Sequence, residues 1–78
     1  MPPSLKIVGV KYESGEYTKF INHDAVYERA NDRIWGQVAG GKDVYIKLKD
    51  LDSIKVEDFS KDPSENYFLT VPEFKKRF

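Results

Sequence analysis

The chain has 78 residues, of which 40% are hydrophobic and 33% are charged, and its thirteen basic and thirteen acidic side chains cancel. This composition is typical of one small folded domain over residues 1–78 and not of a disordered chain. It excludes a membrane span, because no stretch of about 18 apolar residues occurs. The absence of cysteine excludes disulfides and thiolate zinc sites.

The first residues carry no targeting pattern. Met1 to Leu5 show no basic segment followed by an apolar one, so no secretory signal is expected. The cytoplasm is therefore the default localisation.

A hairpin is the first element expected. Leu5 to Glu13 is rich in β-branched and aromatic residues and predicts a strand. Ser14-Gly15 has the form of a two-residue turn. In the register of such a turn Tyr12 faces Tyr17, and Gly9 lies opposite Phe20, an aromatic ring that covers the glycine.

Residues 22–31 allow two interpretations. Asn22 can cap a short helix that carries Asp24 in its first turn. Alternatively, residues 26–30 form a strand that turns at Asn31-Asp32 into a strand over residues 33–39. The apolar spacing makes a poor helical stripe, which favours the strand.

The middle of the chain predicts a second hairpin. Residues 40–43 (Gly-Gly-Lys-Asp) form the turn. Residues 44–49 then alternate, with Val44, Ile46 and Leu48 on one face and Tyr45 on the other.

The last third combines a bend, a loop and a helix. Leu51, Ile54 and Val56 indicate a tight bend, with a helical turn, that leads into a short strand. Residues 58–66 are polar, contain a proline and read as a loop. Residues 70–73 (Thr-Val-Pro-Glu) have the form of a capping box, which predicts a short helix with Val71, Phe74 and Phe78 on one side.

The expected fold class is mainly β. Several short strands at close spacing predict a small antiparallel barrel or curled sheet with a short C-terminal helix. This meander with a glycine-rich turn is similar in architecture to SH3-like barrels, and the similarity implies no function.

Catalytic chemistry has little support in the sequence. His23 is the one histidine, and its turn-forming neighbours indicate a loop residue. With Asp24 and Glu28 it leaves a metal site as a minor alternative. Asp50 and Asp52 read as a solvated bend. We therefore predict no enzyme, no catalytic residue, no metal and no cofactor.

The aromatic residues are the strongest functional signal. Eleven of the 78 residues are Phe, Trp or Tyr, more than so small a core can bury. Aromatic residues with arginine dominate binding hot spots. The candidate binding residues are the members of an expected aromatic groove and the arginines at its rim: Tyr12, Tyr17, Trp35 and Tyr45, with Arg29 and Arg33.

These residues predict a non-enzymatic module, an adaptor or inhibitor, whose partner is another protein. One alternative is a nucleotide-like small ligand held at an oligomer interface by aromatic stacking and by Arg29, Arg33 or Lys42. A further alternative is single-stranded nucleic acid, which the neutral charge and the pI of 6.6 disfavour. Unprotected sheet edges allow self-association, and no membrane partner is expected.

Overall fold

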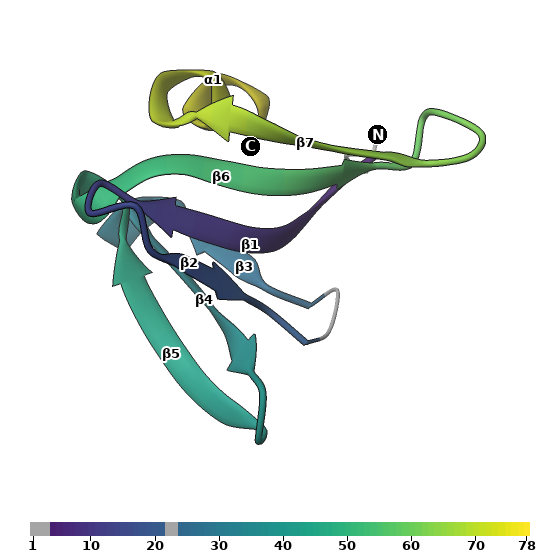
Figure 1. Ribbon diagram of the computed structural model, residues 1–78. Helices are drawn as coiled ribbons and strands as arrows, with labels where there is room; N and C mark the ends of the chain where they lie inside the picture. The colour runs from purple at the N-terminus through teal and green to yellow at the C-terminus, as the bar shows by residue number, and fades with distance from the viewer. Residues whose placement is uncertain (1–3, 22–23) are drawn as a thin grey trace.

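The computed structural model describes residues 4–21 and 24–78 and shows a mainly β protein with one short C-terminal helix (Figure 1). Two single turns of 3-10 helix connect strands, η1 (Arg29–Asn31) and η2 (Leu48–Asp50). The expected fold class is confirmed at this level. The bounds of the strands and of the helix are β1 (Leu5–Tyr12), β2 (Tyr17–Lys19), β3 (Val26–Glu28), β4 (Arg33–Val38), β5 (Lys42–Lys47), β6 (Leu51–Asp58), β7 (Glu65–Thr70) and α1 (Val71–Arg77).

The strands form two antiparallel sheets. One sheet has four strands in the order β2-β1-β6-β7, and the other has three in the order β3-β4-β5. A barrel needs a continuous hydrogen-bonded ladder around its circumference. Here the sheets meet through such contacts as the bond from Ile21 N to Gln37 O (2.9 Å), not through paired strands. They do not close into a barrel, so the SH3-like architecture is not confirmed.

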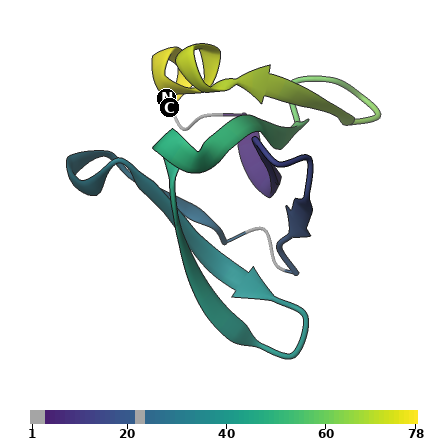
Figure 2. The same ribbon diagram turned by 60° about the vertical axis from the view of Figure 1, so that its left-hand side comes forward.

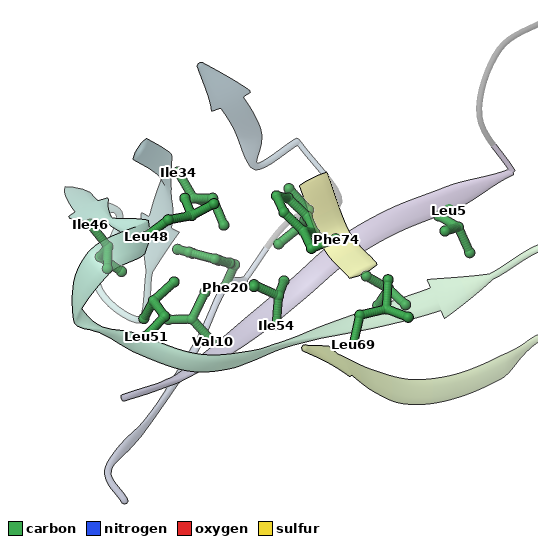
Figure 3. Packing of buried hydrophobic residues seen from close by; sticks show 12 residues of the cluster. Leu5, Val10, Phe20, Ile34, Ile46, Leu48, Leu51, Ile54, Leu69 and Phe74 are labelled. Atoms are coloured by element: carbon green, nitrogen blue, oxygen red, sulfur yellow. The ribbon is translucent and has the colours of Figure 1, made fainter. Parts of the chain in front are cut away.

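The core lies between the inner faces of the two sheets. Figure 2 shows the β4–β5 hairpin extending away from β7 and α1. Buried and exposed positions of β5 and β7 show that one face of each sheet lies outside the core. Close packing of apolar side chains from both sheets and from α1 holds the sheets together (Figure 3). The buried cluster comprises Leu5, Ile7, Val10, Phe20, Ile34, Ile46, Leu48, Leu51, Ile54, Val56, Leu69 and Phe74.

The hairpin between β1 and β2 is present, but its predicted register is wrong by one residue. Tyr12 N donates to Glu16 O at 2.8 Å, and Gly15 N donates to Tyr12 O at 2.9 Å. The loop therefore has three residues, and Gly15 closes it with a φ of 96°, the left-handed conformation typical of such loops. As a result Tyr17 pairs with Lys11 and not with Tyr12.

This shift decides which aromatic ring covers which glycine. A Cβ at Gly9 would lie 2.2 Å from the hydroxyl oxygen of Tyr17, so Tyr17 and not Phe20 covers Gly9. Phe20 is 3% exposed and packs in the core. Its Cδ1 would lie 2.8 Å from a Cβ placed at Gly36. The expected packing of a ring on Gly9 is thus present, but with a different ring.

The described part of residues 22–31 contains a strand, as the apolar spacing indicated. β3 pairs with β4, and Val26 lies opposite Trp35. The strand ends at Glu28, earlier than expected, because η1 follows and Asp32 turns the chain with a φ of 51°. The proposed helix cap at Asn22 lies outside the described residues.

The second hairpin is confirmed in its turn and in its alternation. Gly40 and Gly41 both have positive φ, 93° and 77°. β5 begins at Lys42, two residues earlier than expected, because Lys42 pairs with Val38. Ile46 is buried and Tyr45 is exposed, as the alternation predicted.

The largest departures lie in the second half of the chain. The bend predicted at Leu51, Ile54 and Val56 is wrong, because these residues lie in β6, an eight-residue strand that is central in the four-stranded sheet. The helical turn of this region, η2, comes before Leu51 and includes Leu48, which was expected in the preceding strand. The loop is shorter than expected, since β7 already begins at Glu65. Tyr67 and Leu69 lie on the inner face of this strand, and Asn66 and Phe68 lie on its outer face.

The C-terminal helix is confirmed together with its cap. Glu73 N donates to Thr70 Oγ1 at 3.4 Å, and the Thr70 hydroxyl donates to Glu73 Oε1 at 3.0 Å. Phe74 is fully buried, and Val71 and Phe78 pack against the core. α1 therefore buries the predicted side.

A buried carboxylate ties β6 to the following loop and to β7. Asp58 is 4% exposed, and it accepts hydrogen bonds from Ser60 Oγ (2.6 Å), from Ser60 N (2.9 Å) and from Tyr67 Oη (2.9 Å). Hydrogen bonds from Ser60 are the main cause that lowers the pKa of Asp58 below its ordinary value of 3.8. The charged form is therefore favoured in the folded protein.

We expect this carboxylate to make folding stability depend on pH in the acid range. Because its folded pKa lies below the unfolded value, its contribution is present above about pH 4 and is lost as the pH falls through the folded pKa. Asp58→Asn should lower the melting temperature at pH 7, and the difference from the parent protein should shrink below about pH 4. Thermal melts from pH 7 to pH 2, with the exposed Asp52→Asn as control, measure this. Parallel curves for Asp58→Asn and the parent protein would contradict it.

Candidate functional site

The outer face of the three-stranded sheet carries a row of apolar side chains. Val26, Trp35 and Tyr45 lie side by side across β3, β4 and β5 in the strand register. Val26 is 43% exposed and Tyr45 is 58% exposed. The rings of Trp35 and Tyr45 stack with centroids 6.1 Å apart and an interplanar angle of 29°. We refer to these three residues as the Trp35 row.

Charged residues border the Trp35 row. The next register positions are Glu28, Arg33 and Lys47. Arg33 Nη2 lies 3.0 Å from Glu28 Oε2, and the Arg33 guanidinium carbon lies 4.8 Å from the centroid of the Tyr45 ring. This places the guanidinium against both a carboxylate and a ring, which holds it at the edge of the row.

The carboxylate of Glu28 is itself held in place. Asn31 Nδ2 donates to Glu28 Oε2 at 2.9 Å, and Arg33 Nε donates to the same oxygen at 3.0 Å. These two hydrogen bonds, with that from Asn31 the larger cause, lower the pKa of Glu28. Glu28 is consequently charged at neutral pH and orients Arg33.

The structure brings together three of the six predicted binding residues. Arg33, Trp35 and Tyr45 share the outer face of the three-stranded sheet. Arg29 lies apart from them, in η1, where its guanidinium donates to the carbonyl oxygen of Phe78 at the end of α1.

The two remaining tyrosines lie in the other sheet and on opposite faces. Tyr12 packs against the core, and its hydroxyl is 3.5 Å from Thr18 Oγ1. Tyr17 lies on the outer face, where its ring centroid is 6.2 Å from that of Phe68. Partial burial raises the pKa of the Tyr17 hydroxyl. A single groove that contains all four predicted aromatic residues is therefore not formed.

A second surface, which the sequence did not indicate, surrounds Tyr17. Lys55 Nζ lies 5.9 Å from the ring centroids of both Tyr17 and Phe68. A hollow of about 400 Å³ opens beside them, lined by Val8, Tyr17, Lys19, Phe20, Ile21, Lys55, Glu57 and Asn66. The available sequence signal was the run of aromatic and β-branched residues over 67–71 (Tyr-Phe-Leu-Thr-Val), which favours a strand. Because this run does not alternate between polar and apolar residues, it does not show which face Phe68 takes.

Of the residues considered for catalysis, Asp50 lies in η2 and Asp52 in β6, and both are exposed. His23 lies outside the described residues. Among residues 4–21 and 24–78, no group of three or more His, Asp or Glu side chains is placed to hold a metal ion. Gly40 and Gly41 form the turn of a hairpin.

Comparisons with protein families, with curated proteins and with solved structures found no match for this chain. In the described part of the chain, no helix has the length and apolar character needed to cross a membrane. The functional argument therefore depends on the chain's own surfaces.

Proposed function

We propose that this protein is a non-enzymatic binding module that recognises another protein through the Trp35 row. The observation that carries the proposal is the Val26–Trp35–Tyr45 row, in which Val26 and Tyr45 are exposed and Trp35 is half-buried between them, with charged residues along its border. Interfaces between proteins commonly have this arrangement, an apolar centre within a polar rim. Tryptophan, tyrosine and arginine are also the residues most enriched in hot spots.

The shape of this surface favours a protein partner over a small molecule. The row lies on an open sheet face, and its Tyr45 ring stands 58% exposed. Small ligands are usually enclosed by a concave pocket. The exposed Tyr45 ring is suited to enter a recess on a partner. The ion pair between Glu28 and Arg33 already holds the neighbouring guanidinium in place before a partner binds.

The test is an affinity capture from the source cells with matched variants. The tagged parent protein and Tyr17→Ala should retain the same partner, because Tyr17 lies on the other sheet. Tyr45→Ala should retain it with at least about tenfold lower affinity, which corresponds to about 1.4 kcal/mol. Trp35→Ala should have the same effect while its far-UV circular dichroism stays that of a folded protein.

Three outcomes would contradict the proposal. Undiminished capture by Tyr45→Ala would remove the row from the interface. Dependence on Tyr17 instead would move the interface to the other sheet. Unfolding of Trp35→Ala would show that Trp35 is a core residue. Sedimentation of the purified protein measures its oligomeric state and so distinguishes self-association from binding of another protein. If the parent protein is a dimer and Tyr45→Ala is a monomer, the partner is a second copy of this chain.

A further inference from the structure

The outer face of the four-stranded sheet is basic although the whole chain is neutral. We refer to it as the Tyr17 face. Lysines occupy paired positions on β1, β2 and β6, and Glu57 is the acidic residue among the described paired positions of this face. Glu57 also accepts a hydrogen bond from Ser64 Oγ at 2.6 Å. The lysines are Lys6, Lys11, Lys19 and Lys55.

The centre of the Tyr17 face is aromatic. Gly9 has no side chain, so the Tyr17 ring lies across β1 and reaches Phe68 on β7 in an edge-to-face contact of 75°. Tyr17 is 43% exposed and Phe68 is 49% exposed. Lys55 lies beside both rings, so a planar group stacked there would have a positive charge next to it.

The hollow at the edge of this centre is large enough for one planar ring system. Its volume of about 400 Å³ lies within the range of ligand sites. Its apolar lining comes from Val8, Phe20 and Ile21, and its polar lining includes Asn66, whose amide can both donate and accept hydrogen bonds.

We propose that the Tyr17 face binds single-stranded nucleic acid, with bases against Tyr17, Phe68 and the hollow, and with phosphates on the lysines. Charge complementarity and aromatic stacking are the two terms that hold single strands on proteins. The lysines of β1 are spread over about 15 Å from Lys6 to Lys11, which suits a chain of phosphates better than one phosphate. This site is separate from the Trp35 row and does not depend on the function proposed for it.

The experiment is fluorescence anisotropy with a labelled ten-residue oligothymidylate. Binding should be saturable at about 50 mM salt and should weaken with a log–log slope of about −2 to −3, as expected when three or four phosphates are neutralised. Phe68→Ala should weaken binding about tenfold through the loss of stacking. Tyr45→Ala, which removes an exposed aromatic ring from the other sheet, should bind as the parent does.

A pair of double variants with equal charge change tests the lysines. Lys11→Ala with Lys19→Ala should weaken binding at least about tenfold and reduce the salt slope. Lys42→Ala with Lys76→Ala, at the start of β5 and on α1, should have little effect. Because these lysines are exposed, this comparison stays valid even if Phe68→Ala fails to fold.

Several results would overturn the proposal. These are no saturable binding at low salt, equal losses in the two double variants, and equal competition by polyglutamate of the same charge. Thymidine monophosphate that competes as well as the oligomer would overturn the assignment to a strand and leave a mononucleotide site. Absence of nucleic-acid binding would not contradict the protein-binding function proposed for the Trp35 row. That function is tested separately, by the partner capture with Tyr45→Ala.

Discussion

Phe74→Ala is expected to cost about 3–5 kcal/mol of folding stability, the range for truncating a fully buried phenylalanine. Phe74 is 0% exposed. Its ring meets the Tyr27 ring edge-on at 5.0 Å and stacks on Phe78 at 4.4 Å. Because Tyr27 belongs to the three-stranded sheet and α1 follows the four-stranded one, this ring joins the two sheets.

Polar contacts join the same parts of the molecule. Lys75 Nζ lies 3.3 Å from Asp32 Oδ1, and Arg29 donates to the carbonyl of Phe78. Both are exposed contacts, which contribute little by themselves. The apolar contact of Phe74 should therefore dominate the attachment of α1.

Thermal and urea denaturation of Phe74→Ala measure the effect. For a domain of this size each kcal/mol lowers the melting temperature by about 4–8 °C, so a fall of more than about 12 °C is expected. Phe74→Leu should lose much less, and the exposed Lys76→Ala should stay within about 0.5 kcal/mol of the parent. A fall of only a few degrees for Phe74→Ala would show that α1 does not hold the sheets together.

Gly36→Val is expected to destabilise the protein by about 3 kcal/mol through overpacking. A Cβ at Gly36 would lie 2.8 Å from Phe20 Cδ1 and 3.0 Å from the Cβ of Ala25. Phe20 is buried, so its ring has little room to move away. The glycine is thus required by the close approach of a ring.

A double-mutant cycle isolates this contact. Gly36→Ala should also destabilise, by less than Gly36→Val. Combined with Phe20→Leu, it should cost clearly less than the sum of the two single changes, because the smaller side chain relieves the collision. Chemical denaturation of the four proteins gives the coupling free energy. Additive losses would mean that Phe20 does not restrict position 36.

Local patterns in the sequence predicted the faces of individual elements. Strict alternation in residues 44–49 put Ile46 inside and Tyr45 outside, and the structure confirms both. The capping box predicted where α1 begins and which side it buries. These predictions hold because the direction of each side chain repeats about every 2 residues in a strand and about every 3.6 residues in a helix. Neighbouring residues in the sequence are therefore enough to show which face is buried.

The same patterns failed where a short turn controls distant pairing. One extra loop residue at Gly15 moves Tyr17 from the partner position of Tyr12 to that of Lys11. Since successive strand residues point to opposite faces, that single step separates the two tyrosines. The polar residues of β7 were read as a loop for a related reason, because an exposed edge strand and a loop share polar composition.

Local sequence patterns are enough to predict a small mainly β domain with a capped C-terminal helix and more aromatic residues than its core can bury. They do not predict that the strands divide between two sheets, which is a property of the folded chain. That division puts Trp35 and Tyr45 on one surface and Tyr17 and Phe68 on another, and it collects lysines on the second although the chain is neutral overall. The physical reason is that sheet membership depends on pairing between residues far apart in the chain, which neither composition nor local periodicity encodes.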